Sequence, residues 1–262
     1  MTTDKMLSET DGPVGTLIFN NPARHNAVSG DMWAAASEIL GGFIADDAIR
    51  AIVVTGAGGK AFVSGADISK FEDERANAEA EEKYHARTAQ ARAMLVNSPK
   101  PTIAKIRGYC IGGGVATALG CDIRICSDNS RFAIPAARLG LGYDYDGIRR
   151  LVGVVGPSFA KEIFFTARQF SAEEAKDMRL VDRVVPADEL DAYVRDYALT
   201  IAGNAPLTMQ AAKRSVAEGL KNPADRDLAA CEALVDQANA SQDHVEGRTA
   251  FMEKRKPVFT GR

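Results

Sequence analysis

The sequence lacks the residue patterns that usually bind metals or form disulfides. Its four cysteines contain no CxxC pair and lie in apolar surroundings, and its three histidines are scattered along the chain. These cysteines are Cys110, Cys121, Cys126 and Cys231. We therefore expect free thiols in a reducing compartment and no metal site.

Strong charge and long apolar runs are also missing. The net charge of −3 at pH 7 provides no basic surface for nucleic acid or for an anionic membrane. No apolar run approaches the roughly 18 residues that span a bilayer. The first residues, MTTDKMLSETDG, are polar and acidic, unlike the apolar part of a secretory signal. The sequence thus predicts a cytoplasmic protein with no nucleic-acid or membrane partner.

The first half of the chain alternates strand and helix patterns. Short apolar, partly β-branched runs at Gly15–Asn20, Ala51–Thr55, Thr102–Ile106 and Ile123–Ser127 indicate buried strands. Between the first two, Ser29 can cap a helix whose apolar residues recur at helical spacing. The stretch from residue 72 to 83 is dense in charge and predicts an exposed helix or a flap. This alternation predicts an α/β core of parallel strands with right-handed crossovers.

After Pro157 the pattern becomes helical. Ser171 and Glu174 fit a capping box that opens a helix ending near Met178. Four further helices are predicted, over Ala187–Gly203, Pro206–Leu220, Arg226–Ala240 and Asp243–Lys254. A helical tail with little sheet of its own must bury its apolar faces elsewhere, and a neighbouring subunit is one natural place.

Two glycine-containing turns carry the chemistry of the predicted site. Gly112–Gly114 separates a strand-like from a helix-like segment, so it can present bare backbone N–H groups to a ligand. Gly65 follows another strand-like run, where a small residue allows close backbone approach. Two N–H groups from separate turns that converge on one carbonyl oxygen form an oxyanion hole, which stabilises an enolate or a tetrahedral anion.

Six segments give the chain a resemblance to a known family. They are NPARHNA (21–27), AFVSGADI (61–68), GYCIGGG (108–114), GCDIRICSDNSRF (120–132), FTARQFSAEEA (165–175) and AFMEKRKPVF (250–259). In this order, over essentially the whole chain, they resemble the crotonase superfamily, the enoyl-CoA hydratase/isomerase family. The resemblance implies an α/β spiral of ββα units over residues 1–198 and a helical trimerisation region over residues 199–262. It also implies a homotrimer or dimer of trimers, an acyl-CoA substrate, and no cofactor beyond the coenzyme A of that substrate.

The resemblance assigns roles to individual residues. The N–H groups of Ser64 and Gly113 would hold the thioester oxygen, and Arg24 would either meet a phosphate of coenzyme A or remain a solvated surface arginine. Phe251 and Lys254 would close the coenzyme A pocket, from the same or a neighbouring subunit. The adenine and pantetheine channel would be lined by Gly65, Ala66, Asp67 and Ile68.

The chain departs from the hydratases of this family at two positions. Ala116 and Ala136 stand where the resemblance places the two hydratase glutamates, and a methyl group neither activates water nor delivers a proton. In the loop that follows, Asp144 resembles the working aspartate of dienoyl-CoA isomerases and 4-chlorobenzoyl-CoA dehalogenases. Tyr143 falls close to a functional tyrosine of methylmalonyl-CoA decarboxylases. Turn formation alone is the other explanation for aspartates beside glycine.

These residues predict isomerisation or decarboxylation of a CoA thioester, with Asp144 as base or orienter and Tyr143 as proton donor. Three alternatives stay open: hydration with a relocated acid and base, hydrolysis or dehalogenation with Asp144 as nucleophile, and a non-catalytic acyl-CoA-binding protein. We expect Asp144 to be partly desolvated in a closed pocket, and Asp146 to face away from it if the segment is extended.

Overall fold

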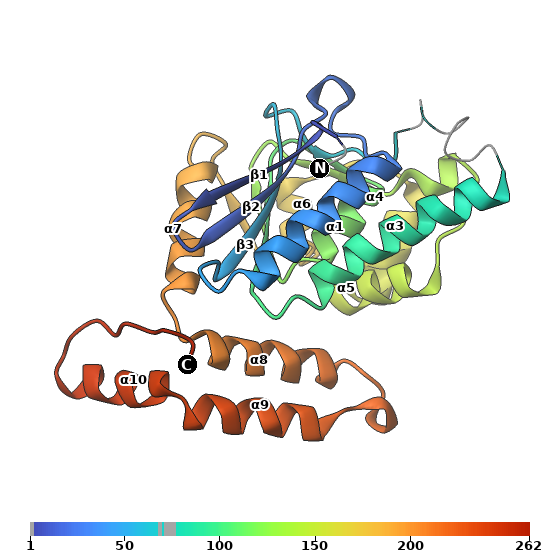
Figure 1. Cartoon of the computed structure of the whole chain (residues 1–262). Helices are drawn as coiled ribbons and strands as arrows, with labels where there is room; N and C mark the ends of the chain where they lie inside the picture. The colour runs from blue at the N-terminus through green and yellow to red at the C-terminus, as the bar shows by residue number, and fades with distance from the viewer. Residues whose placement is uncertain (1–2, 68–69, 71–76) are drawn as a thin grey trace.

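The computed structural model describes residues 3–67, 70 and 77–262. The described residues form two sheets, with helices around them (Figure 1). The strands are β1 (Met6–Asp11), β2 (Val14–Phe19), β3 (Ala51–Gly56), β4 (Ala61–Val63), β5 (Thr102–Ile106), β6 (Tyr109–Ile111), β7 (Ile123–Ser127), β8 (Arg131–Ala133), β9 (Phe170–Ser171) and β10 (Arg183–Val185). The α-helices are α1 (Gly30–Ala45), α3 (Ala78–Val96), α4 (Gly113–Leu119), α5 (Tyr145–Thr166), α6 (Ala172–Asp177), α7 (Leu190–Ala202), α8 (Pro206–Gly219), α9 (Leu228–Ala240) and α10 (Gln242–Met252). Short 3-10 helices among the described residues include η1 (Pro22–Arg24), η3 (Pro135–Arg138) and η4 (Pro223–Asp225).

The larger sheet has the order β1-β2-β3-β5-β7-β10, and the smaller one has the order β4-β6-β8-β9. In the larger sheet every neighbouring pair is parallel except β1 with β2. In the smaller sheet β4, β6 and β8 are parallel and β9 is antiparallel to β8. The predicted parallel α/β core is therefore confirmed, with one antiparallel strand added at an edge of each sheet.

The larger sheet lies between two helical layers. The helices α1 and α3 lie on one side of it and α7 on the other (Figure 1). The first layer belongs to a large apolar core that contains Phe19, Trp33 and Phe62. The second core, which includes Val53 and Val194, joins α7 to the sheet. Apolar burial on both faces explains why the central strands are almost uninterrupted runs of apolar residues.

Local sequence signals located several elements correctly. The Ser29 side chain accepts a hydrogen bond from the Met32 N–H and caps α1. Ser171 and Glu174 form the expected capping box at the start of α6. The four predicted strands match β5 and β7 and lie within one residue of β2 and β3 at each end. These predictions are confirmed because caps and buried strands depend mainly on neighbouring residues.

Three elements differ from expectation. The strand β1 lies in the polar N-terminal stretch, for which no strand was predicted; it is an edge strand, and all its residues except Met6 are exposed. The charged stretch leads into α3, which continues to Val96 and buries Tyr84, Thr88, Ala91 and Leu95 along one face. Residues 71–76 of that stretch lie outside the described residues. The end of the predicted loop forms α5, which Asp144 caps.

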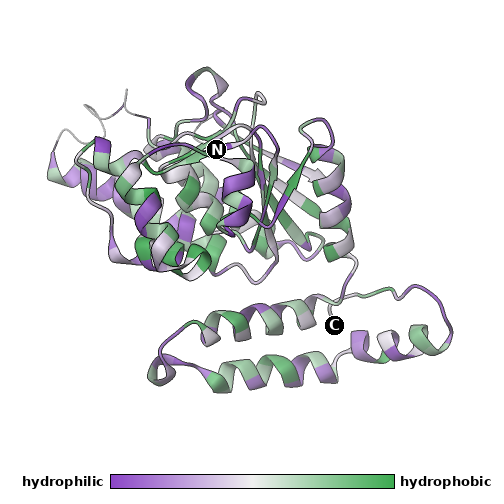
Figure 2. Cartoon of the chain, turned by 180° about the vertical axis from the view of Figure 1, so that it is seen from behind, coloured by the Kyte–Doolittle hydropathy of each residue, from purple (hydrophilic) through white to green (hydrophobic). Residues whose placement is uncertain are grey.

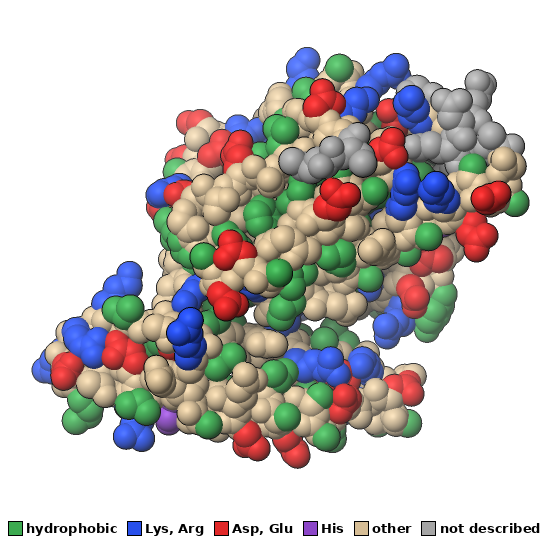
Figure 3. All heavy atoms as spheres, in the orientation of Figure 1, with side chains coloured by type: hydrophobic (Ala, Val, Ile, Leu, Met, Phe, Trp, Pro, Cys, Tyr) green, Lys and Arg blue, Asp and Glu red, His purple; other side chains and the backbone are tan. Residues whose placement is uncertain are grey.

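The three last helices extend away from the sheets (Figures 1 and 2). The helix α7 runs through the predicted boundary at residue 198, since Ala198 and Ala202 both belong to the core under the sheet. Beyond it, α9 has no buried residue, and Phe251 of α10 is 83% exposed. Hydrophobic side chains appear among charged ones on the surface of this region (Figure 3). An ion pair of 2.7 Å between Lys213 Nζ and Asp122 Oδ2 links α8 to the core.

Candidate active site

The two glycine turns lie next to each other because the strands before them are paired. Strands β4 and β6 run parallel, with Ala61 opposite Tyr109, so the turns that follow leave the same edge of the smaller sheet. A Cβ atom added to Gly65 would lie 3.8 Å from the Gly113 nitrogen. The structure therefore brings together Gly65 and Gly113, two of the predicted site residues.

The second turn depends on the absence of side chains. Gly112 has a φ of +54° and donates its N–H to the Ala133 carbonyl at 2.7 Å. A Cβ atom on Gly114 would lie 2.0 Å from the Val63 carbonyl oxygen, so no side chain fits there. Gly113 is the first residue of α4, and its N–H has no carbonyl partner within the helix. Among the described residues, no carbonyl accepts a hydrogen bond from the N–H of Ser64 or of Gly113.

Tyr143 approaches this turn from the segment before α5. Its hydroxyl oxygen lies 3.9 Å from the place where a Cβ atom on Gly112 would be. Its ring packs edge-on against Phe164, with 5.0 Å between ring centroids. Burial raises the pKa of the Tyr143 phenol, although the nearby Arg92 opposes this shift. The phenol is thus protonated at neutral pH and can donate a proton or a hydrogen bond.

Asp144 differs from its expected state. It is the N-cap of α5, and its Oδ1 accepts a hydrogen bond of 2.7 Å from the Gly147 N–H. The residue is exposed, so the expectation of a partly desolvated carboxylate is wrong. Asp146 lies in the first turn of α5 and lines the same cavity as Asp144. Asp146 was expected to face away only if the segment were extended, and this condition is not met because the segment is helical from Tyr145 onward.

A cavity of about 470 Å³ lies among α3, α4 and α5. Its walls include Ala116, which the resemblance places at one hydratase glutamate position, together with Asp144 and Asp146. Ala136, which the resemblance places at the other, is buried in η3. The cavity thus combines a small residue at a position assigned to catalysis with charged side chains from α5.

Arg92 of α3 is a member of the site that the sequence analysis missed. Its Nη2 atom lies 3.5 Å from the Gly113 carbonyl oxygen, and its guanidinium lies 5.5 Å from the Trp33 ring centroid. Burial lowers the pKa of Arg92. No local signal marks this arginine, because it stands in a highly charged helix 21 residues before Gly113.

The remaining predicted residues of the core surround the first turn. The exposed Arg24 ends η1, and its carbonyl accepts from Ser64 Oγ at 3.3 Å. Ala66 forms a bridge with Val28, and the buried Asp67 donates its N–H to the Val28 carbonyl at 3.0 Å. Ile68 lies outside the described residues.

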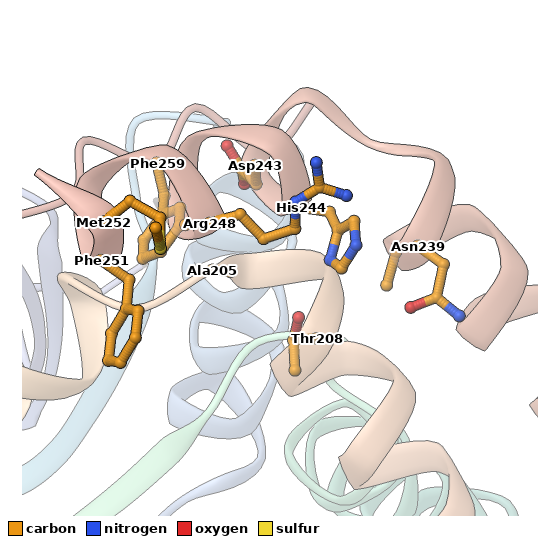
Figure 4. Close-up of a pocket in the computed structure, with 11 residues that line it drawn as sticks. Ala205, Thr208, Asn239, Asp243, His244, Arg248, Phe251, Met252 and Phe259 are labelled. Atoms are coloured by element: carbon orange, nitrogen blue, oxygen red, sulfur yellow. The ribbon is translucent and has the colours of Figure 1, made fainter.

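Phe251 and Lys254 are not brought to the glycine turns within one chain. Phe251 of α10 lies at the edge of a separate cavity of about 560 Å³ formed by the C-terminal region (Figure 4). Lys254 is exposed just after the end of that helix. That cavity is lined by Ala205, Thr208, Ala238, Asn239, Asp243, His244, Gly247, Arg248, Phe251, Met252 and Phe259.

Two further properties hold for the described part of the chain. Within it, none of the helices combines the length and the apolar character needed to cross a membrane. The same residues contain no group of three or more His, Cys, Asp or Glu side chains arranged to hold a metal ion.

Comparison with known proteins identifies the family. The family model described as enoyl-CoA hydratase/isomerase matches residues 9–262. A short-chain-enoyl-CoA hydratase of Clostridium acetobutylicum is 33% identical, covering 98% of this chain and 97% of its own length. A carnitinyl-CoA dehydratase of Proteus mirabilis is 34% identical, with 97% of each chain covered. The crystal structure of an enoyl-CoA hydratase/carnithine racemase from Magnetospirillum magneticum superposes with a TM-score of 0.92 at 36% identity, covering 99% of this chain and 97% of the other. The chain belongs to the enoyl-CoA hydratase/isomerase family, within the crotonase superfamily.

Proposed function

We propose that this acyl-CoA enzyme forms a thioester enolate and holds its oxygen between the backbone N–H groups of Ser64 and Gly113. The observation that carries the proposal is the approach of the two turns, with the Gly113 nitrogen 3.8 Å from the Cβ position of Gly65. Two donors fixed by the fold stabilise the developing oxyanion without reorganisation, an effect worth about 10²- to 10³-fold in rate for each donor.

The proposed reaction is isomerisation or decarboxylation of the thioester. In decarboxylation the carbon–carbon bond to a carboxylate breaks, CO₂ leaves, and the electron pair remains as the enolate, which then takes a proton at carbon. In isomerisation a base removes a proton from carbon and an acid returns one at another carbon. Tyr143 is proposed as the proton donor because its phenol stays protonated beside Gly112. Asp144 is proposed as the base or as a group that orients the substrate.

Hydration is the second candidate. Two relatives named as hydratases, at 33% and 32% identity, favour it. Ala116 and Ala136 supply no acid or base, so hydration would need other carboxylates. Asp144 and Asp146 line the same cavity as Ala116 and are the side chains proposed for that role. The nucleophilic use of Asp144 and a non-catalytic acyl-CoA-binding role are the remaining alternatives.

The cofactor, the assembly and the location belong to the same proposal. No cofactor is required beyond the coenzyme A carried by the substrate, and the enzyme is cytoplasmic. The exposed apolar side chains of α8–α10 support a homotrimer or a dimer of trimers, in which Phe251 and Lys254 of one subunit close the coenzyme A pocket of the next. Sedimentation measures this directly: a stable monomer at micromolar concentration contradicts the assembly.

A panel of thioesters tests the reaction. We would incubate the protein with crotonyl-, 3-enoyl-, dienoyl-, methylmalonyl- and aroyl-CoA and analyse the products by mass spectrometry. Loss of CO₂ indicates decarboxylation, and an unchanged mass with altered absorbance indicates isomerisation. A gain of water from crotonyl-CoA at about 10 per second or faster would replace the proposal by hydration. Tight binding without turnover of any member would support the non-catalytic alternative.

A further inference from the structure

The cavity beside the glycine turns is lined by two arginines that form no ion pair with a described carboxylate. Arg92 from α3 and Arg150 from α5 line it together with Asp144 and Asp146. Within the described ranges, no carboxylate oxygen lies within 4.0 Å of a nitrogen of either guanidinium. The Asp144 carboxylate is already stabilised by the Gly147 N–H at the N-terminus of α5. Among the described residues, Asp144 and Asp146 thus act on Arg92 and Arg150 only at longer range, without an ion pair.

Arg92 is the more enclosed of the two. Its Nε is inaccessible to solvent and has no hydrogen-bond partner among the described residues. The one polar contact of its guanidinium there is the 3.5 Å approach of Nη2 to the Gly113 carbonyl. Arg214 provides a contrast, since its equally enclosed Nε lies 2.9 Å from the Glu218 carboxylate. Removing a charge from water without forming an ion pair costs free energy, so the surroundings of Arg92 favour the binding of an anion.

We propose that Arg92 binds a carboxylate carried by the acyl group of the substrate, which makes CoA thioesters of dicarboxylic acids the substrate class. The inference rests on the proposed function, because Arg92 would face an acyl group only if the thioester oxygen lies at Ser64 and Gly113. The planar guanidinium matches a carboxylate with two parallel hydrogen bonds. Arg150 adds a second positive charge at the wall of the same cavity.

A structural role for Arg92 is the competing explanation. By donating to the Gly113 carbonyl, Arg92 could act only as a brace for the second glycine turn. Loss of such a brace would weaken the binding of every thioester to a similar degree. Loss of a carboxylate-binding group would weaken only thioesters that carry a carboxylate. The ratio of two affinities therefore separates these roles.

The test measures binding by calorimetry for three pairs of thioesters of equal carbon number: malonyl- and propionyl-CoA, succinyl- and butyryl-CoA, and glutaryl- and pentanoyl-CoA. Mass spectrometry of the recovered ligand verifies that it is intact. We expect the wild-type protein to bind the carboxylated member about 10- to 100-fold more tightly in at least one pair. Arg92→Met should remove this preference, and Arg92→Lys should retain part of it. Arg149→Met is the matched control, because Arg149 does not line the cavity, and it should leave the preference unchanged.

Each other outcome has a defined meaning. Equal affinities within all three pairs, or a preference that survives in Arg92→Met, overturn the inference and leave the oxyanion proposal standing. Failure of every thioester to bind the wild-type protein overturns both. If Arg92→Met does not fold, Arg92→Gln provides a second uncharged variant, and equal wild-type affinities within all three pairs would still overturn the inference.

Discussion

The two halves of the candidate site are built from different parts of the residues. The half made by the turns after β4 and β6 consists of backbone, and a Cβ atom on Gly114 would overlap the Val63 carbonyl. The half at the start of α5 consists of side chains, the half-buried Tyr143 and the exposed Asp144. The first half is therefore sensitive to added volume, whereas the second is sensitive to the loss of a functional group. Mutations that change only one of these properties can test this difference.

The largest effect is expected from Gly114→Ala. The new Cβ would lie 2.0 Å from a backbone oxygen, which cannot move without separating β4 from α4. We expect the free energy of unfolding to fall by about 3 kcal/mol or more and Tm to fall by roughly 6 °C or more, together with loss of turnover. Gly153→Ala is the matched control in α5, since a Cβ there meets nothing within 4 Å. Its free energy of unfolding should increase by about 1 kcal/mol. Equal melting temperatures for the two variants would contradict the claim that the turn at Gly114 has no room for a side chain.

Gly113→Val should impair catalysis more than folding. Its Cβ would lie 3.3 Å from Nη2 of Arg92 and 3.5 Å from Gly65 Cα, so the branched side chain would occupy the space between the turns. Turnover should fall on the order of 10²- to 10³-fold, as measured by kcat/KM on the substrate found by the thioester panel. Ser64→Ala keeps the backbone N–H and should be mild. A severe, well-folded Ser64→Ala variant would instead assign catalysis to the hydroxyl.

Tyr143→Phe tests the side-chain half without changing its volume. The ring retains its contact with Phe164 and loses only the proton donor, so turnover should fall about 10²-fold at nearly unchanged Tm. Tyr145→Phe, at a 76% exposed position, is the control and should remain active. A Tyr143→Phe variant as active as the control would remove Tyr143 from the mechanism.

The pH dependence of the wild type checks the same residue. Burial raises the pKa of Tyr143 above its ordinary value of 10.0, so the donor is lost only as the pH rises through that higher value. In the pH profile of kcat/KM, the decrease caused by deprotonation of Tyr143 should therefore lie above pH 10. This decrease should be absent from the profile of Tyr143→Phe. Stability changes in the same direction: above pH 10 the unfolded chain releases this proton first, so unfolding becomes easier as the pH increases.

Asp144→Asn is expected to have the smallest of these effects. Asparagine caps helices as well as aspartate does, so α5 should remain stable. Because the carboxylate is exposed and one oxygen already accepts from Gly147, we expect turnover to fall by less than about 10²-fold while thioester binding persists. Asp146→Asn is the matched control. Full activity of both variants would place the base elsewhere, and a covalent acyl-enzyme in the wild type would favour a nucleophilic Asp144.

Short-range signals in the sequence determined much of the fold. Ser29, Ser171 and Glu174 cap their helices through bonds that span three residues, so they could be found without the tertiary structure. Buried strands such as β7 are visible as apolar runs. The glycine turns could be predicted for the same reason, since Gly65 and Gly112–Gly114 follow strands directly. The six segments that resemble the family predicted the fold of the whole chain, beyond these local signals.

Only the tertiary structure decided which distant groups share the site. Arg92 reaches the Gly113 carbonyl from α3, and no pattern within α3 distinguishes this arginine from its charged neighbours. Asp144 resembled a loop carboxylate, but the helical path of α5 makes it an exposed cap. Caps and apolar runs depend on a few neighbouring residues. Burial depends on elements that meet only after the chain has folded, and it raises the pKa of Tyr143 and lowers that of Arg92.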